Sequence, residues 1–438
     1  MTTTTELYEK YLQHSRITFD TRKLQPGDIF FALRGDLNDG NDYAAQALAA
    51  GAAYAVIDRP ELADRDPRFL LVANSLKALQ DLARHHRRQF HIPVIGITGS
   101  NGKTTTKELV TAVMAIHYRN THATAGNYNN HIGVPLTLLA MPASTEAAII
   151  EMGANHQGEI DTLSRICEPT HGIITNIGNA HLEGFGGIEG VKKGKSELYR
   201  FLAERDGVAI INGDENFLLD LAAPVARKIV YQRSNNPHPT HKPAEIKLIA
   251  THPFIRYAFL DEDGTLLEGD AHLSGEHNFN NVMTAVAVGK YFKVPGKKIC
   301  EAIANYIPGN NRSQKLEKNG IIFHLDAYNA NPNSMQASLH NFAQAEAPFK
   351  AAFLGDMLEL GEVAPAEHLR IAQLALSLNF NHIALVGPHF AQAAHNLSLP
   401  HFAGVDDLRS WFNRQNWSGG YHILLKGSRG MKMERLIE

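Results

Sequence analysis

The sequence predicts an α/β protein of three domains. Its 438 residues correspond to about three domains, since a domain averages roughly 150 residues. Short apolar runs alternate with helical stretches through most of the chain, which is typical of parallel sheets covered by helices. The pattern breaks near residues 90 and 310. We therefore expect a small N-terminal α/β domain at 1–90, a central parallel-sheet domain at 91–310 and a Rossmann-like C-terminal domain at 311–438.

The first unit contains two strand signals, at 28–32 and 53–57, on either side of an alanine-rich helix at 43–51. A second helix is predicted at 76–88 and ends in the basic run Arg-His-His-Arg-Arg at 84–88. Such a run could form a nucleic-acid or metal patch. Because it is short, we interpret it as a solvated helix end that enters a linker.

The central unit is predicted to be built on a parallel sheet with an antiparallel extension. Its buried-strand signals are apolar runs at 94–97, 147–150, 172–175 and 207–211. Helices are predicted at 103–117, 278–291 and 296–305. Between 245 and 274 the residues alternate around the turn Glu-Asp-Gly, which indicates antiparallel strands appended to the sheet.

The third unit follows the turn-forming segment Pro-Gly-Asn-Asn at 308–311. Its predicted strands lie at 321–325, 350–354, 382–386 and 421–425, and its predicted helices lie at 333–345, 365–377 and 405–414. This alternation indicates a small doubly wound domain.

Composition excludes several classes of protein. Apolar residues make up 44% and charged residues 20% of the chain, and 42 basic against 45 acidic residues leave a net charge of -3. That balance argues against broad nucleic-acid binding, which needs a basic surface. No apolar run reaches the roughly 18 residues of a membrane span, the first residues lack the features of a secretory signal, and two cysteines form no disulfide framework. We expect a cytoplasmic, multi-domain enzyme or binding protein.

A phosphate-binding loop is predicted at 98–105, where Thr-Gly-Ser-Asn-Gly-Lys-Thr-Thr follows a strand and opens a helix. Its glycines let backbone amides approach phosphate oxygens, and the helix N-terminus adds positive potential. Lys103 would neutralise phosphate charge and Thr104 would reach a metal ion. Ile97 stands where the usual pattern has its first glycine, so the loop is a variant. A turn without a ligand is the alternative, but the surrounding strand and helix favour an ATPase-like P-loop domain. The candidate residues are Thr98, Gly99, Ser100, Asn101, Gly102, Lys103, Thr104 and Thr105.

Three downstream residues are candidate metal ligands. Glu151 ends an apolar run, at the edge of a parallel sheet where ligands bind, and its carboxylate suits Mg²⁺; a solvated loop acid is the alternative. His181 follows the next strand, although a histidine in a loop is usually plain surface. Lys195 belongs to the cluster at 192–195, which on its own indicates a solvated face.

Further motifs follow one another in an order that resembles a known enzyme family. The N-terminal ones are Asp-Thr-Arg at 20–22, Pro-Gly-Asp at 26–28 and Asp-Gly at 39–40. The central ones are Gly-Asn-Tyr-Asn-Asn-His-Ile-Gly-Val-Pro at 126–135, Glu-Met-Gly-Ala-Asn at 151–155, Ala-His-Leu-Glu-Gly-Phe-Gly at 180–186 and His-Asn-Phe-Asn-Asn at 277–281. The C-terminal ones are Arg312, Asp-Ala-Tyr-Asn-Ala-Asn-Pro at 326–332 and Gly-Asp-Met-Leu-Glu-Leu-Gly at 355–361. In these motifs the chain resembles the ATP-dependent Mur ligases of peptidoglycan synthesis.

The runs at 153–155, 181–186 and 328–332 resemble the branch of the family that adds D-alanyl-D-alanine. The Asp-Asn-Pro-Arg signature of the branch that adds diaminopimelate or lysine is absent. The sequence departs from the family at His131, where an acidic residue is common, and before Arg312, where a glycine is common.

The resemblance implies a reaction in which ATP, UDP-MurNAc-tripeptide and D-Ala-D-Ala give ADP, phosphate and UDP-MurNAc-pentapeptide through an acyl phosphate. It implies two Mg²⁺ sites, and it implies that Lys195 is carbamylated, since a carbamate supplies oxygen ligands in place of a cation. We expect a monomer with no nucleic-acid partner. A related ligase of the folylpolyglutamate type, with another acceptor, is the first alternative. A nucleotide-dependent binding protein without turnover is the second.

The resemblance also assigns roles to residues. The implied catalytic residues are Lys103, Glu151, His181 and Lys195. The implied metal ligands are Thr104 and Glu151 for the first Mg²⁺, and His181 and Lys195 for the second. The remaining implied ATP contacts are Asn278 and Asn281 to adenine, Arg312 to a phosphate and Asp326 to the ribose. The implied substrate contacts are Thr21, Arg22, Asn127, Asn129, Asn130, Asn329 and Asn331.

Overall fold

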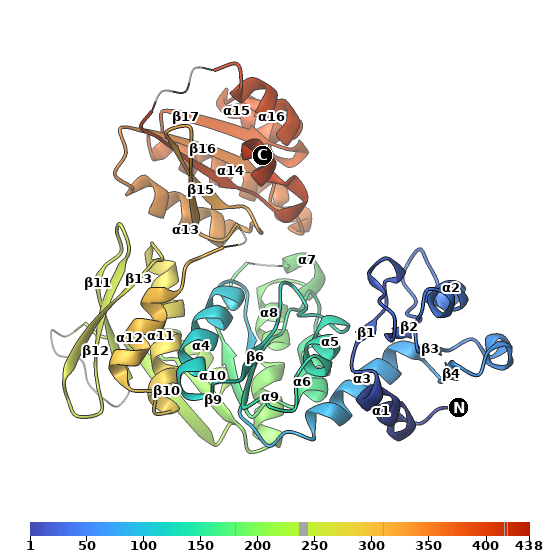
Figure 1. Ribbon diagram of the computed structural model, residues 1–438. Coiled ribbons are helices and arrows are strands. Elements are labelled where there is room, and N and C mark those ends of the chain that lie inside the picture. The colour runs from blue at the N-terminus through green and yellow to red at the C-terminus, as the bar shows by residue number, and fades with distance from the viewer. Residues whose placement is uncertain (180, 236–243, 310, 416, 418) are drawn as a thin grey trace.

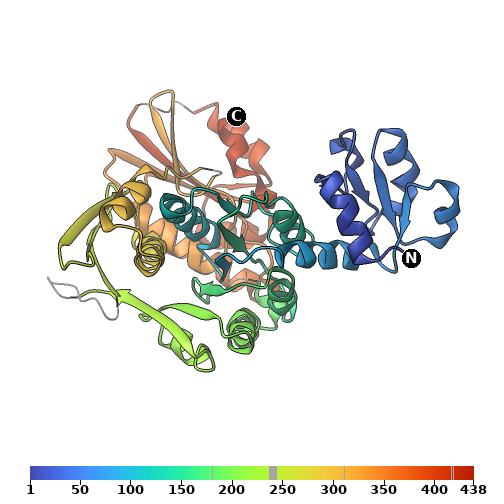
Figure 2. The same cartoon turned by 60° about the horizontal axis from the view of Figure 1, so that its bottom comes forward.

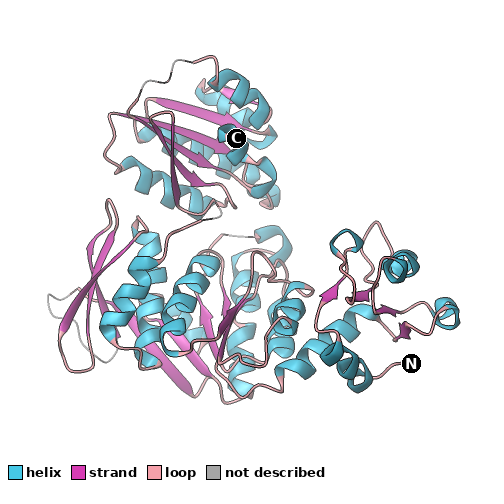
Figure 3. Cartoon of the chain, in the orientation of Figure 1, coloured by secondary structure: helices cyan, strands magenta, loops and turns pink. Residues whose placement is uncertain are grey.

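The computed structural model describes residues 1–179, 181–235, 244–309, 311–415, 417 and 419–438. Ala180, of the 180–186 run, and Asn310, at the predicted domain boundary, lie outside the described residues. The described residues form three sheets in three consecutive parts of the chain, with helices packed around each (Figures 1 and 3). The predicted α/β class is confirmed.

The N-terminal part contains a small parallel sheet in the order β1-β2-β3-β4. Its strands are β1 (Ile17–Thr18), β2 (Ile29–Phe31), β3 (Tyr54–Ile57) and β4 (Phe69–Leu71), and its helices are α1 (Thr4–Gln13), α2 (Ala44–Ala49) and α3 (Ser75–Arg87). β1, β4 and α1 were not predicted. The two strands are only two or three residues long, which is too short for an alternating pattern to emerge.

Helix α3 connects the N-terminal part to the rest of the molecule (Figures 1 and 2). Our interpretation of its basic end as a solvated terminus is wrong for His86 and Arg87, which are both buried. The Arg87 guanidinium donates to the carbonyls of Cys167 at 3.0 Å, Glu168 at 3.1 Å and Phe90 at 2.7 Å. Arginine suits this role because its planar guanidinium carries five N–H donors, which can bond to several carbonyls at once. The run therefore fastens the linker helix to the central part.

The central part contains a nine-stranded sheet in the order β13-β12-β11-β10-β9-β8-β5-β7-β6. Its strands are β5 (Val94–Thr98), β6 (Thr121–Ala123), β7 (Ala147–Glu151), β8 (His171–Ile174), β9 (Val208–Asn212), β10 (Arg227–Arg233), β11 (Ala244–Ala250), β12 (Ile255–Leu260) and β13 (Leu266–Ala271). Neighbours from β6 to β11 pair in parallel, whereas β11, β12 and β13 pair antiparallel. The predicted antiparallel extension is confirmed.

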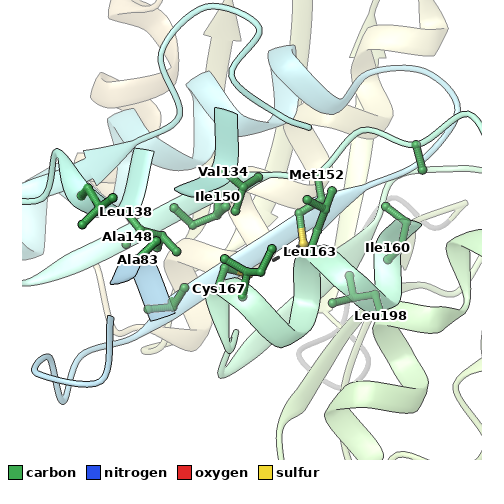
Figure 4. Packing of buried hydrophobic residues seen from close by; sticks show 14 of the residues in the cluster. Ala83, Val134, Leu138, Ala148, Ile150, Met152, Ile160, Leu163, Cys167 and Leu198 are labelled. Carbon is green, nitrogen blue, oxygen red and sulfur yellow. Dashed lines mark hydrogen bonds between the residues drawn. The ribbon is translucent and has the colours of Figure 1, made fainter. Parts of the chain in front are cut away.

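Helices cover both faces of this sheet (Figure 3). One set is α5 (Gly133–Leu139), α6 (Glu159–Cys167), α7 (Leu182–Phe185), α8 (Ile188–Lys195), α9 (Glu197–Glu204) and α10 (Asn216–Leu221), and the other is α4 (Lys103–His117), α11 (Glu276–Tyr291) and α12 (Gly296–Asn305). Figure 4 shows the packing on the α5–α6 side, where Ala83 of α3 joins Leu138, Ala148 and Cys167 in one buried cluster. The linker helix therefore shares the core of the central sheet.

The C-terminal part contains a six-stranded sheet in the order β14-β15-β19-β16-β17-β18. Its strands are β14 (Gln314–Lys318), β15 (Ile321–Asp326), β16 (Phe349–Gly355), β17 (His382–Val386), β18 (His401–Phe402) and β19 (Tyr421–Lys426), and its helices are α13 (Pro332–Ala343), α14 (Ala364–Ser377), α15 (Ala391–Leu397) and α16 (Val405–Phe412). All pairs are parallel except β14 with β15. The predicted Rossmann-like arrangement is confirmed, with an antiparallel edge strand added.

Short 3-10 helices lie in the connections: η1 (Thr21–Lys23), η2 (Gly40–Tyr43), η3 (Pro60–Arg65), η4 (Gly361–Val363), η5 (Pro388–Phe390), η6 (Arg429–Met431) and η7 (Met433–Ile437). None of the described helices has the length and apolar character needed to cross a bilayer. The C-terminal part lies over the edge of the central part at which α4 begins (Figure 1), and that junction holds the site.

Candidate active site between the central and C-terminal sheets

A cavity of about 620 Å³ opens between the central and C-terminal parts. Most of the predicted site residues line it: Ser100, Asn101, Gly102, Lys103, Thr104, Thr105, Asn129, Asn130, Glu151, His181, Asn278, Asn281, Arg312, Asp326, Asn329 and Asn331. The cavity thus brings together residues that are more than 200 positions apart in the sequence. The predicted residues that do not line it are Thr21, Arg22, Thr98, Gly99, Asn127 and Lys195.

The phosphate loop leaves β5 and enters α4 at Lys103. The Lys103 ammonium donates to the carbonyls of Gly99 at 2.7 Å and Ser100 at 3.0 Å, which folds the side chain back over the loop. Burial lowers the pKa of Lys103 to about 8, although the Glu151 carboxylate opposes this shift. The first amides of α4 have no acceptor within the helix, so cation and amides face the cavity together, as phosphate binding requires.

Gly99 is needed at the sharpest point of the loop. Its φ of 142° lies outside the range that side chains favour, and a Cβ there would come within 2.0 Å of Thr175 Oγ1. The next residues are held by Asn176, whose carbonyl accepts from Ser100 N at 3.0 Å and whose side chain accepts from Asn101 N at 3.0 Å. The exit of β8 therefore fixes the shape of the loop, even though the usual first glycine is missing.

Thr104 and Glu151 meet on the floor of the cavity. Glu151 ends β7, which pairs with β5, and its carboxylate accepts from Thr104 Oγ1 at 2.9 Å and from Asn129 Nδ2 at 2.9 Å. Both residues are buried, and Thr104 is itself part of the phosphate loop. No cluster of three or more His, Cys, Asp or Glu suited to a metal occurs among the described residues. One carboxylate and one hydroxyl nevertheless fit Mg²⁺, which binds through one or two protein oxygens together with substrate phosphates.

His181 enters the cavity from the start of α7, with a left-handed φ of 55°. Its Nδ1 atom contacts the Glu359 carboxylate of the C-terminal part. The side chain is partly buried, with 18% exposed. His181 therefore lies at the junction between the two parts rather than on the plain surface.

Lys195, at the end of α8, is buried and does not line the cavity. Its ammonium donates to the carbonyl of Ala154 at 3.1 Å and lies 4.9 Å from the centre of the Phe185 ring. Burial and the nearby charge of Lys103 hold the pKa of Lys195 well below its ordinary value. A solvated face, the simpler interpretation of its lysine cluster, does not apply to this residue.

Asn278 and Asn281, on the first turns of α11, are buried between the loop and the C-terminal part. Asn281 donates to Asn278 Oδ1 at 3.1 Å and accepts from Thr106 Oγ1 at 3.0 Å. The Asn278 amide donates to Ser313 Oγ at 3.2 Å. These amides form a chain of hydrogen bonds from α4 to the C-terminal part.

The C-terminal part contributes two charged groups. Asp326 ends β15 and pairs with the buried Lys426, whose ammonium lies 2.7 Å from Asp326 Oδ2. Burial would raise the pKa of Asp326, but the positive charge of Lys426 outweighs it and the pKa is lowered. The Arg312 guanidinium lies 3.6 Å above the centre of the Tyr328 ring, a stacking geometry that leaves its edges free to bind an anion.

Two asparagines tie this part to the phosphate loop. Asn331 caps α13, where it accepts from Ser334 N at 2.9 Å, and its amide donates to Asn101 Oδ1 at 2.7 Å. Asn329 accepts from Ala330 N at 2.9 Å and shapes the same turn.

Replacing Asp326 should destabilise the protein. Asp326→Ala leaves the buried ammonium of Lys426 without its counter-charge, and breaking a buried pair in this way costs about 3 kcal/mol. The free energy of unfolding, measured by urea titration, should fall by that order. The double variant Asp326→Leu/Lys426→Met removes both charges and should recover most of the loss. An unchanged single variant would contradict the pairing.

Some predicted substrate contacts lie away from the cavity. Thr21 and Arg22 belong to η1 of the N-terminal part, where Arg22 pairs with Asp20 at 2.8 Å and is 87% exposed. Asn127 is exposed. Asn130 reaches the cavity but also caps a turn, accepting from Gly133 N at 2.9 Å.

The structure also brings residues to the cavity that our sequence analysis did not assign to the site, including Asn176, Tyr328 and Lys426. Lys426 had a usable signal. It follows the apolar run Ile-Leu-Leu at 423–425, so it stands at the carboxyl end of a buried parallel strand, as do Glu151 and Asp326. For Asn176 and Tyr328 the sequence gives no comparable signal apart from the motifs beside them.

Three models of one protein family match consecutive parts of the chain. The chain matches the models of the Mur ligase family, catalytic domain, over residues 14–87, of the Mur ligase middle domain over 97–289 and of the Mur ligase, glutamate ligase domain over 311–429.

Two named relatives match almost the whole chain. The UDP-N-acetylmuramoyl-tripeptide–D-alanyl-D-alanine ligase of Bacillus subtilis (strain 168) is 34% identical and covers 98% of this chain and 94% of its own. The enzyme of the same name from Escherichia coli (strain K12) is 34% identical, with 96% and 92% covered. A crystal structure of MurF from Acinetobacter baumannii superposes with a TM-score of 0.86 at 32% identity, over 96% of this chain and 92% of that one. Relatives 34% identical over nearly the full length, together with matches to all three models, show that the chain belongs to the Mur ligase family.

Proposed function

We propose that this protein is the ATP-dependent ligase that joins D-alanyl-D-alanine to UDP-MurNAc-tripeptide in peptidoglycan precursor synthesis. The observation that carries the proposal is that Lys103 of the P-loop lines the same cavity as Arg312 and Asp326 of the C-terminal part. Relatives that bear the name of this activity, at 34% identity over nearly the whole chain, support the choice of substrates.

The reaction couples two steps. The γ-phosphoryl group of ATP passes to a tripeptide carboxylate, which forms an acyl phosphate and releases ADP. The amine of D-Ala-D-Ala then attacks the acyl carbon, the bond from that carbon to the phosphate oxygen breaks, and the amine gives up a proton as the amide forms. Since two anions must meet in the first step, the site has to supply positive charge between them.

Lys103 and Arg312 would supply that charge from opposite walls of the cavity, Lys103 on the β- and γ-phosphates and Arg312 across the domain junction. Asp326 would accept a hydrogen bond from the ribose, and Asn278 and Asn281 would contact adenine. Asn329 and Asn331 would order the ATP or the dipeptide on the C-terminal side. These groups act mainly by positioning the reactants.

Thr104 and Glu151 would hold one Mg²⁺, and His181 and Lys195 a second one. Bound Mg²⁺ would neutralise charge on the transferred phosphoryl group. For Lys195 we propose the carbamate. Its lowered pKa favours the neutral amine, which adds to CO₂ and loses a proton to give an anionic carbamate.

Thr21 and Arg22 would bind the uridine nucleotide on the N-terminal domain, and Asn127, Asn129 and Asn130 would contact the peptide near the phosphate loop. We propose domains at 1–90, 91–310 and 311–438 and a monomer that works in the cytoplasm, where both substrates would be made.

A coupled assay of phosphate release tests the proposal. Release should require ATP, UDP-MurNAc-tripeptide and D-Ala-D-Ala together, and mass spectrometry should show the pentapeptide product. Release with glutamate and a folate instead would favour the folylpolyglutamate-type alternative. Nucleotide binding without release under either condition would favour a binding protein that has lost turnover.

A further inference from the structure

The contact between His181 and Glu359 joins two parts of the chain that are 178 residues apart. His181 belongs to the central part and Glu359 to the turn at 356–361 of the C-terminal part. His181 lines the cavity beside Glu151, whereas Glu359 does not line it. The contact joins Nδ1 of His181 to the carboxylate of Glu359, and a carboxylate oxygen accepts hydrogen bonds. Glu359 therefore contacts His181 from outside the cavity lining.

The 356–361 turn is held firmly at its base. The Met357 amide donates to His368 Nε2 at 3.0 Å and the Leu358 amide donates to Ser428 Oγ at 2.9 Å. The Asp356 carboxylate is buried and accepts from the backbone amides of residues 389 and 390. Each of these partners belongs to the C-terminal part, so the position of Glu359 follows that part as one body.

Backbone conformation indicates that the contact is built rather than incidental. Glu359 has a φ of 65° and His181 a φ of 55°, and residues other than glycine adopt this left-handed region at a cost. Such conformations persist where the surroundings impose them, and they gather at functional sites. Gly361 also lies at this junction, since a Cβ built at its position would be 3.4 Å from Glu183 Cβ of the central part.

The bond decides which nitrogen of His181 is available. Nδ1 is engaged by the carboxylate, so Nε2 is the nitrogen left for a ligand in the cavity. Carboxylates that accept from the second nitrogen of a metal-binding histidine fix its tautomer and ring orientation. Glu359 is 56% exposed, and an exposed pair adds little to the free energy of folding. The main effect of the contact is therefore to orient the His181 ring.

We infer that Glu359 is a positioning residue that sets the tautomer and ring orientation of His181, so that the second metal position is complete only when the C-terminal domain is docked. This inference rests on the proposed ligase function, which supplies the metal. It is tested on the binding of metal and ATP alone, without tripeptide or dipeptide.

The test uses the full chain with ATP and Mn²⁺ in place of Mg²⁺, in four variants. Mn²⁺ affinity of the ATP complex is measured by titration, and electron spin echo spectra detect nitrogen bound to Mn²⁺. Glu359→Ala should weaken Mn²⁺ binding about tenfold, the lower end of what the loss of such a partner costs, and should weaken the nitrogen signal. Glu359→Gln keeps an acceptor oxygen and should stay near the unmodified protein. The matched control is Glu362→Ala, an exposed acid three residues along the chain, and His181→Ala gives the spectrum without the ligand.

Three results would overturn the inference. These are unchanged Mn²⁺ binding and signal in Glu359→Ala, an equal loss in Glu359→Gln, or no nitrogen signal in the unmodified protein. A melting temperature shared by the four variants shows that each is folded. A protein that shows the expected binding pattern but gives no ligation in the coupled assay would contradict the proposed function and leave this inference standing.

Discussion

Lys103→Ala should lower turnover about a thousandfold and leave the protein folded. The loss follows because removing one preorganised donor from a developing charge costs on the order of a hundred- to a thousandfold, and Lys103 is the cation of the phosphate loop. The fold should survive, since the hydrogen bonds of the ammonium to the described residues go to two carbonyls of its own loop. Phosphate release measures turnover, and circular dichroism with a thermal melt measures folding.

A matched control is Lys192→Ala, because Lys192 is a lysine of α8 that pairs with Glu189 at 2.7 Å on the surface. It should keep normal turnover. If Lys103→Ala turned over at a near-normal rate, the assignment of 98–105 as a phosphate loop would fail. A variant that fails to fold would be replaced by Lys103→Met, which keeps the length and apolar part of the side chain.

Lys195→Ala should reduce turnover at least a hundredfold, and short carboxylic acids should restore part of it. The proposed carbamate supplies an anionic oxygen ligand, and truncation at a side chain that is 1% exposed leaves a space in which acetate or formate can place a carboxylate. The rescue should saturate with acid concentration. Carbon NMR of protein equilibrated with labelled CO₂ should show one carbamate signal that Lys195→Ala lacks.

Lys192→Ala again provides the control, since Lys192 lies three residues away on the same helix and should retain both activity and the carbamate signal. A fully active Lys195→Ala variant would refute the carbamate role. An inactive variant that no acid rescues, in a protein without the carbamate signal, would indicate a structural role for Lys195 through the Ala154 carbonyl and the Phe185 ring.

Local sequence patterns predicted the helices and strands of this fold, because both the periodicity of apolar residues and the residues that end an element lie close together in the sequence. The helix predicted at 103–117 has those bounds in the structure, and the strands predicted at 321–325 and 382–386 lie within one residue of theirs. The same reasoning placed Glu151 at the carboxyl end of a parallel strand, whereas Asp326, next to the strand predicted at 321–325, received its role from the family resemblance. It would also have found Lys426, had it been applied to every strand.

Long-range contacts could not be predicted in this way. Glu359 contacts His181 only after two domains have folded and docked. No sequence pattern around either residue indicates that the two side chains meet. The basic run at 84–88 was misjudged for a related reason. Burial of Arg87 depends on carbonyls at 167 and 168, about 80 residues further along the chain.

The hydrogen bonds of His86 and Arg87 help to set the distance between the N-terminal sheet and the phosphate loop. Because they and the shared core hold α3 against the central domain, the N-terminal sheet keeps a fixed span from the phosphate loop (Figures 1 and 2). If the donor binds at Arg22, as we propose, its nucleotide, sugar and peptide would have to bridge that distance before its carboxylate could meet ATP at Lys103. A donor whose stem peptide is one residue shorter would bind at Arg22, but its carboxylate would not reach ATP at Lys103. On that proposal, the enzyme would select its donor by length, through the position of α3, a helix that contacts none of the reacting atoms.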